Sequence, residues 1–351
     1  MPLRFPNPGS DINRLVHIFR IIYQDTSDSA DFSLDDMSRI MTSHMQASSR
    51  GAVGSQALSR STGDDRSRDP LYNQSKSYSE VFRMLGWLRP TDQRLQFSIT
   101  HLGGQIADDY SSHPDLAFGL LRECLIGVCF PNPATENLGI INHRPFKWLL
   151  QLAAALDGVI TRHEMILGLL SVPDDLVPNS FENAVSTIQG LRGKRAKLME
   201  AVDQMADASR IQRVTLENYT RFPVGVLKSS EVGWAFSGKV AGLYERPIEA
   251  LSLTEFGFAT AKSLSNMTDV RQSSLTDFPV DQQADFANFA YYAMLLRSGY
   301  QLSEIGDDLV SSSHSSTLLR NALGISDDPL KLLYSPIQQA PDEILRVAET
   351  R

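Results

Sequence analysis

Residues 78–110, YSEVFRMLGWLRPTDQRLQFSITHLGGQIADDY, contain the pattern from which we predict the fold. Apolar residues recur at helical spacing over 81–88 and then alternate with polar residues over 95–99, as they do in a strand. Residues 90–92, Pro-Thr-Asp, supply a turn, and Thr100 can cap a following helix. The sequence therefore predicts a helix, a two-stranded hairpin and a second helix.

A distant stretch, VGWAFSGKVAGLYERPIEALSLTEFGFATAKSL at 232–264, ends in the same pattern. An apolar strand reaches Thr254, and a glycine follows that threonine at the same spacing as Gly103 follows Thr100. The two endings match as SITHLG and SLTEFG. A short helical core closed by a hairpin and a Thr-initiated helix is typical of a winged helix-turn-helix. We therefore expect a mainly α-helical protein with small β-hairpins, built on two such units.

The length of 351 residues exceeds what one hydrophobic core usually covers. We predict a first winged-helix domain at 1–115 with a basic polar insert at 46–76, a second winged-helix domain at 116–270, and an acidic helical C-terminal domain at 271–351. The net charge of −8 comes mostly from the last of these, because residues from 275 onward carry 5 Lys and Arg against 11 Asp and Glu. The rest of the chain is close to neutral, so its charge does not exclude a nucleic-acid partner.

Several other classes of protein are not expected. No apolar run approaches the roughly 18 residues of a membrane span, and the first residues lack the order of a secretory signal, so we expect a cytoplasmic protein. The spacing of Cys124 and Cys129 fits neither a metal knuckle nor a disulfide framework and favours buried thiols. The seven histidines are scattered without a metal-binding pair, so we expect no metal site and no cofactor in this chain.

The sequence from Gly233 to Lys239 matches the GxxxxGK pattern of a phosphate-binding loop. However, Val240 stands where a Ser or Thr must bind Mg2+, and Trp234 and Phe236 would crowd the loop. A hairpin strand of the second winged helix is the better interpretation.

In a winged helix, the N-terminal part of the recognition helix faces the major groove, where Asn or Gln can pair with adenine and Arg or Lys with guanine. The residues predicted for this role in the first unit are Tyr72, Asn73, Gln74, Lys76 and Ser77. The insert contributes candidates for phosphate or minor-groove contacts, which are Arg60, Arg66 and Arg68. The alternative for the insert is a solvated loop.

The second unit has a basic run that could follow the phosphate backbone. Its residues are Arg192, Lys194, Arg195 and Lys197. We also predict a second recognition element at Asn218, Thr220 and Arg221, with backbone contacts from Lys228 and Lys239. The alternative is an ordinary solvated helix face.

The order of elements from residue 78 to about 170 resembles the recognition region of FokI-like type IIS restriction endonucleases. The segments that carry the resemblance are LGWL, the hairpin, SITHLG, LLRECLIG, RPFKWLLQLAAALDG and ITRHE. The resemblance implies tandem winged-helix subdomains that read DNA and a separate C-terminal nuclease domain that cuts it. The second hairpin, at 232–264, falls where the second subdomain of that family would close.

The expected nuclease motif is absent from the sequence. Such nucleases use an Asp/Glu-x-Lys pair on a strand to hold Mg2+ and organise water, and this chain has no such triplet. The nearest variant, Gln74-Ser75-Lys76 after Asp69, enters a helix rather than a strand. The resemblance therefore implies a non-catalytic chain, with cleavage and its Mg2+ supplied by a partner nuclease or a missing domain.

We therefore predict a sequence-specific double-stranded DNA recognition protein or subunit of a restriction-modification or defence nuclease system. Its partners would be duplex DNA and a nuclease, with possible homo-oligomerisation through the C-terminal domain and no membrane contact. One alternative is a tandem winged-helix protein-interaction subunit of an SMC-type complex. Another is a self-sufficient endonuclease with a degenerate site near Lys76.

Overall fold

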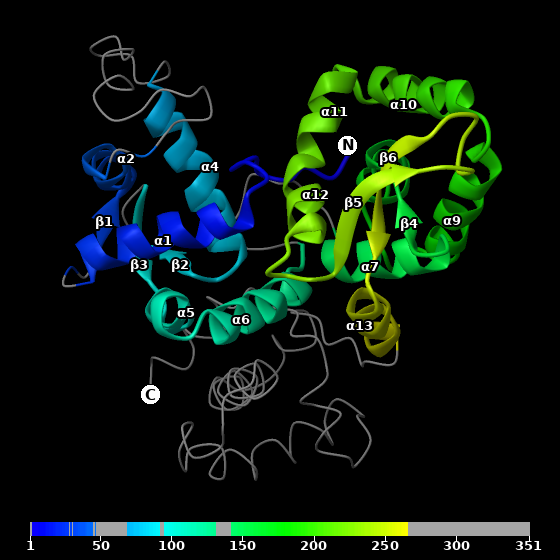
Figure 1. Ribbon diagram of the computed structural model, residues 1–351. Helices are drawn as coiled ribbons and strands as arrows, with labels where there is room; N and C mark the ends of the chain where they lie inside the picture. Colours follow the sequence, from blue (N-terminus) through cyan, green and yellow to red (C-terminus); the bar gives the residue numbers. More distant parts are fainter. Residues whose placement is uncertain are drawn as a thin grey trace. The chain divides into compact units, whose positions relative to one another are not determined.

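The computed structural model describes most of the chain up to residue 265, and these residues form two compact units (Figure 1). The N-terminal unit comprises residues 13–128, and the central unit comprises 2–12 together with 129–130 and 142–265. The predicted acidic domain and Arg60, Arg66 and Arg68 of the insert lie outside the described residues. The described residues are 2–27, 29, 31–44, 46, 69–91, 95–130 and 142–265.

The N-terminal unit has five helices and a three-stranded antiparallel sheet among its described residues. Its elements are α1 (Ile12–Thr26), β1 (Phe32–Ser33), α2 (Leu34–Ser43), α4 (Pro70–Met84), β2 (Leu88–Pro90), β3 (Gln96–Ile99), α5 (His101–Ser112) and α6 (Pro114–Gly127). Three aromatic rings form the centre of its core, since Phe19 lies 4.9 Å from both Phe82 and Trp87 between ring centroids. All three side chains are fully buried.

The central unit follows the same plan with additional helices. Its elements are α7 (Pro145–Ala155), β4 (Val159–Ile160), α8 (Arg162–Met165), the short π-helix η3 (Ile166–Leu170), α9 (Ser180–Leu191), α10 (Arg195–Ser209), α11 (Arg213–Tyr219), α12 (Arg221–Lys228), β5 (Ala235–Val240), β6 (Ile248–Leu253) and α13 (Glu255–Ser265). The chain start completes its core, because Phe5 packs on Phe130 and Phe146, and the Leu3 amide donates to the Leu170 carbonyl at 2.9 Å. The predicted mainly helical fold with small antiparallel sheets is confirmed.

Local capping explains where the second helix of each unit begins. Ser33 and Asp36 form a reciprocal capping box at the start of α2, and Thr161 and Glu164 form the same box at the start of α8. The cap Ser33 is the last residue of β1, and the cap Thr161 directly follows β4. The two units therefore enter this helix in the same way.

The two sheets share one topology and one register. Their strand orders are β1-β3-β2 and β4-β6-β5. Phe32 pairs with Phe97 in the first sheet, and Ile160 pairs with Leu251 in the second. The first residue of each pair directly precedes the residue that caps the next helix. The second lies three residues before the closing threonine. The hairpin registers agree as well. The similarity between SITHLG and SLTEFG thus reflects a repeated structural unit.

The repeated Gly-Trp and Thr-x-x-Gly sequences form one junction in each unit. Thr100 and Thr254 each cap the closing helix, and each hydroxyl donates to a glycine carbonyl, at 2.6 Å to Gly86 and 2.7 Å to Gly233. Those glycines have φ of 76° and 75°, a left-handed conformation that favours glycine. The predicted hairpins and Thr-capped helices are confirmed, and residues 235–239 of the GxxxxGK pattern lie on β5.

The unit boundary differs from the predicted one at 115/116. Helix α6 packs against α5 and belongs to the N-terminal unit, so the division falls between Val128 and Cys129. Residues 2–12 belong to the central unit. The helical spacing seen in the sequence identified α6 as a helix, but the partner of its apolar face depends on tertiary packing.

Both cysteines are buried free thiols, as the sequence predicted. Burial raises the pKa of the Cys124 thiol to about 12, so it is protonated at neutral pH. We expect neither thiol to react with a thiol-labelling reagent in the folded protein at about pH 8, and both to react once denaturant is added. Labelling of Cys124 in the folded protein at the rate of a free thiol would contradict this placement.

None of the described helices is both long enough and apolar enough to cross a membrane.

Candidate nucleic-acid interface

A basic hollow of about 510 Å³ lies in the central unit, between α8, the start of α10, α12 and the hairpin of β5 and β6. Its charged lining has four cationic side chains and one carboxylate. These residues are Arg162, Arg195, Lys228, Lys239 and Glu249, with His163 beside them. Because like charges gathered around one hollow repel each other, an anion bound there would relieve that repulsion.

Each cationic side chain comes from a different element. Arg162 and Arg195 are the first residues of α8 and α10, and Lys228 is the last residue of α12. Lys239 lies on β5 directly opposite Glu249 on β6. Within the described part of the chain, none of the four cationic groups forms a salt bridge. Their donors therefore remain available to a ligand.

The hairpin that forms one wall of the hollow is anchored by a buried carboxylate. Glu164 is fully buried and accepts hydrogen bonds from Arg192 Nε and from the Tyr244 hydroxyl, both at 2.9 Å, and from the Thr161 amide at 2.7 Å. Burial and the adjacent Glu164 carboxylate raise the pKa of Tyr244, so the phenol remains a donor. This contact joins α8, the end of α9 and the hairpin loop.

The hairpin loop is also joined to the start of α10. The Gly193 amide donates to the Leu243 carbonyl at 3.0 Å, and the Arg195 amide donates to Glu245 Oε2 at 3.1 Å. Beneath these bonds, Leu198, Tyr244 and Ile248 form a buried apolar cluster. The added helices α9 and α10 therefore support the hairpin.

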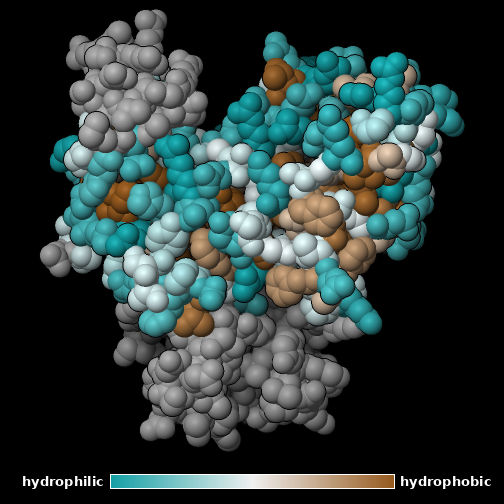
Figure 2. Space-filling model, viewed as in Figure 1, coloured by the Kyte–Doolittle hydropathy of each residue, from teal (hydrophilic) through white to brown (hydrophobic). Residues whose placement is uncertain are grey.

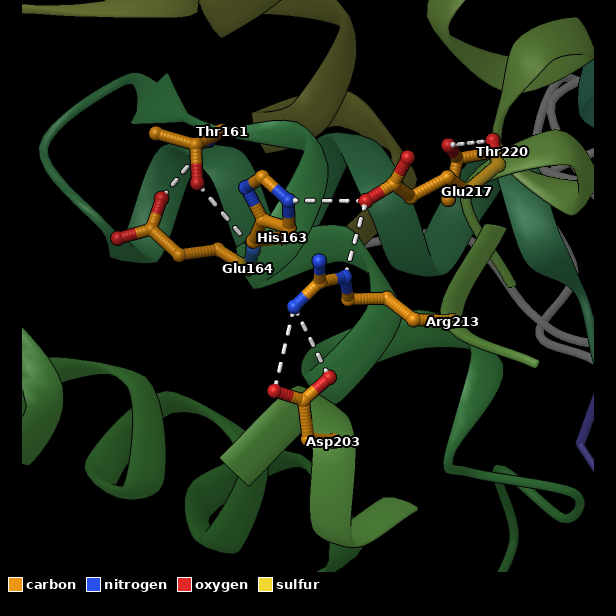
Figure 3. A network of polar contacts seen from close by, with 7 residues as sticks. All are labelled: Thr161, His163, Glu164, Asp203, Arg213, Glu217 and Thr220. Carbon is orange, nitrogen blue, oxygen red and sulfur yellow. Dashed lines mark hydrogen bonds and ion pairs between the residues drawn. The ribbon is translucent and has the colours of Figure 1, made fainter. Parts of the chain in front are cut away.

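A second polar network links α8, α10 and α11 next to the hollow (Figure 3). His163 Nε2 lies 3.5 Å from Glu217 Oε1, and Arg213 Nε lies 3.7 Å from the same oxygen. Arg213 also bonds to Asp203 at 3.0 Å. Burial lowers the pKa of His163, and the nearby cations Arg162 and Arg213 lower it further, against the opposite effect of Glu217.

The lowered pKa of His163 predicts a pH dependence of stability. Because the unfolded state binds this proton more tightly, with a pKa of about 6.5, stability should fall as the pH drops below that value and level off below the folded-state pKa. We expect His163→Gln to have a flatter stability curve than wild type across this window, as measured by urea unfolding at several pH values. Parallel curves for the two proteins would contradict the assignment.

Two of the predicted DNA contacts in the central unit, Arg192 and Thr220, are largely or fully buried. Arg192 faces inward, where its guanidinium also donates to the Leu156 and Val159 carbonyls. Thr220 is fully buried, and its hydroxyl donates to the Glu217 carbonyl. Asn218 is half-buried. The exposed predicted residues are Lys194, Arg195, Lys197, Arg221, Lys228 and Lys239, of which Arg195, Lys228 and Lys239 line the hollow.

In the N-terminal unit, the predicted recognition residues fall on the first two turns of α4. Asn73 and Lys76 are exposed, Tyr72 and Ser77 are half-buried, and the Lys76 ammonium lies 4.7 Å from the centre of the Tyr72 ring. Gln74, also predicted to read bases, is only 6% exposed, so its side chain faces the interior of the unit. Helix α4 begins at the Asp69 cap, and its inward face is set by packing on α2.

The Gln74-Ser75-Lys76 triplet does not have the geometry of a nuclease site. It lies within a helix, and Ser75 is fully buried with its hydroxyl bonded to the Leu71 carbonyl at 2.9 Å. Among the described residues, no group of three or more His, Cys, Asp or Glu side chains is placed to hold a metal ion.

The sequence analysis did not single out Arg162, which lines the hollow, or Tyr244, which anchors the hairpin. The capping box at Thr161 placed Arg162 in the first turn of a helix, which was the available signal. Tyr244 lies 80 residues from Glu164 along the chain, so no local pattern indicates their contact.

Comparisons with known proteins indicate a distant structural similarity. No protein-family model matches the chain, and no curated protein matches it. Among solved structures, the chain is similar to the restriction endonuclease FokI, with 13% sequence identity and a TM-score of 0.36. The match covers 95% of this chain and 61% of the FokI chain. A similarity this weak indicates only a distant relationship.

Proposed function

We propose that this chain is a sequence-specific double-stranded DNA recognition protein, or the recognition subunit of a restriction or defence nuclease, with cleavage supplied by another domain or chain. The observation that carries the proposal is the basic hollow, formed where the helix before the hairpin meets the hairpin itself. A winged-helix protein meets DNA with these two elements.

The repeated topology supports a winged-helix interpretation of both units. Each has a helix, a short strand, a capped helix, a further helix, a hairpin and a Thr-capped closing helix. Helices α4 and α12 precede the hairpins and so take the position of recognition helices. On α4, the exposed Asn73 has the amide that can pair with both N6 and N7 of adenine.

A protein-binding function is the second candidate, because large apolar side chains are exposed on the central unit. Phe236 on β5 and Phe256 and Phe258 on α13 are 57%, 49% and 42% exposed. Figure 2 shows apolar surface over β5. Such a surface suits a protein partner, as in the accessory subunits of SMC-type complexes.

Salt dependence separates the two candidates. We expect affinity for a fluorescent duplex, measured by anisotropy, to fall by about three orders of magnitude between 50 and 200 mM salt if about six phosphate contacts are made. A fall of less than about threefold would contradict DNA binding through phosphates and would favour the protein-binding alternative.

Adding Mg2+ to the isolated chain tests where cleavage resides. We expect the chain to bind duplexes without cutting them, because the metal-dependent step belongs to a partner nuclease. Mg2+-dependent cutting by the purified chain would instead support a self-sufficient endonuclease.

A further inference from the structure

We infer that the two units divide the work of DNA recognition: the hollow of the central unit binds the sugar-phosphate backbone without reading sequence, whereas α4 of the N-terminal unit reads bases. This inference rests on the proposed function and assigns a ligand chemistry, the phosphodiester backbone, to the hollow. Four structural observations carry it.

First, the N-terminal tip of α12, the recognition-helix position of the central unit, offers few side chains to bases, because Arg221 is the only exposed residue among 220–223. There Thr220 and Phe222 are fully buried, and Pro223 is buried as well. The cation that α12 brings to the hollow, Lys228, stands at the opposite, C-terminal end of the helix. A lysine ammonium is a point charge that suits phosphate, and it lacks the planar fork with which arginine reads guanine.

Second, the hairpin of the central unit is fixed rather than free to enter a groove. Glu164 holds Tyr244 of the hairpin loop, and the Gly193 and Arg195 amides bind the same loop. Lys239 is therefore presented from a wall of constant position. A preorganised set of cations gains more from binding phosphates than a mobile one, because less side-chain and loop freedom is lost.

Third, the charge that lines the hollow matches a polyanion. Arg162, Arg195, Lys228 and Lys239 reach it, against the single carboxylate of Glu249. The four come from separate elements, so no single helix face explains their convergence.

Fourth, the N-terminal unit has the complementary features. A hollow of about 340 Å³ between α1, β1 and α2 is lined by Asp25, Asp31 and Asp36 with Arg39, and its charge is unsuited to phosphate. The N-terminal unit also exposes Asn73 and Lys76 at the tip of α4, and the Asn side chain is the amide type that reads adenine. The two units thus differ in the chemistry they present.

The test compares three variants of the full chain on two duplexes, one selected from a random pool and one of unrelated sequence. Lys228→Gln/Lys239→Gln removes two charges from the hollow. Lys262→Gln/Arg210→Gln removes two exposed charges elsewhere in the central unit and serves as the matched control. Asn73→Ala removes the exposed side-chain amide from the tip of α4. Affinity is measured by anisotropy across a salt series, and thermal melting verifies that each variant is folded.

We expect the hollow variant to lose about tenfold or more in affinity for both duplexes alike. The slope of log affinity against log salt should decrease by about 1.8, or 0.9 per phosphate contact. The control should keep the wild-type slope. Asn73→Ala should lower the preference for the selected duplex by roughly 5- to 100-fold while keeping the slope.

A hollow variant with the wild-type slope, or one that changes the preference between duplexes more than about fivefold, would overturn the inference. An Asn73→Ala variant with unchanged preference would overturn the half that concerns α4. Failure of the proposed function would look different, because the wild-type chain would itself bind no duplex with a steep salt dependence. If the wild-type chain binds duplexes but selects no sequence, base reading by α4 is refuted. The salt slope of the hollow variant still tests whether the hollow binds the backbone.

Discussion

Gly257→Ala should destabilise the central unit by about 3 kcal/mol or more, the upper range for overpacking a closely packed site. An alanine Cβ at this position would lie 2.1 Å from the Trp234 carbonyl oxygen. That oxygen cannot move aside at low cost, because it accepts a hydrogen bond from the Thr254 amide at 3.0 Å. We expect the melting temperature to fall by roughly 10 °C in a thermal denaturation scan.

Two other glycines give matched comparisons. Gly103→Ala in the N-terminal unit should destabilise for the same reason, because its Cβ would lie 2.4 Å from the Trp87 carbonyl oxygen. At Gly190 on α9, an added Cβ would meet nothing within 4 Å. Gly190→Ala should therefore stabilise the central unit by roughly 0.5–1 kcal/mol, because alanine has the higher helix propensity. Equal melting temperatures for the variants at 257 and 190 would refute the close approach at the helix-strand junction.

Glu164→Gln should cost about 3 kcal/mol of stability, because it removes the negative partner of a mostly buried cation. The Arg192 side chain is only 15% exposed, and Glu164 is the carboxylate that it contacts. The neutral Gln side chain would also have to accept the hydrogen bonds that Glu164 accepts from the Tyr244 hydroxyl and the Thr161 backbone amide. The free energy of unfolding from urea titration measures this loss.

The exposed ion pair of Asp203 and Arg213 provides the control for this change. Both side chains are about half exposed, so Asp203→Asn should cost less than about 1 kcal/mol. Because the Glu164 contact holds the hairpin, Glu164→Gln should also increase amide hydrogen exchange at Leu243 and Tyr244. The account of the anchored hairpin fails if the two variants lose the same stability and show the same exchange.

Much of the fold could be predicted because its signals are local. The change from helical to alternating spacing placed the hairpins, and the threonines at 100 and 254 placed the closing helices. The repeat was visible because each junction requires the same residue types in the same order. A glycine is needed where φ is positive or where a helix approaches a carbonyl, and both requirements appear in the sequence.

The direction of polar side chains on correctly predicted helices or loops could not be predicted from the sequence. Gln74 and Arg192 have the composition of surface residues, yet each faces a neighbouring element that the sequence does not identify. Arg192 pairs with a carboxylate 28 residues away, and Tyr244 reaches the same carboxylate from 80 residues away. Charge runs indicate a basic surface, but only tertiary packing decides which members of the run reach it.

Selection of duplexes from a random-sequence pool by the full chain, followed by sequencing of the bound fraction, measures whether this chain recognises a DNA sequence. Sequence-specific recognition predicts that one short motif is enriched over successive rounds, at both 50 and 150 mM salt. A bound pool with the base composition of the starting pool at every position would contradict it.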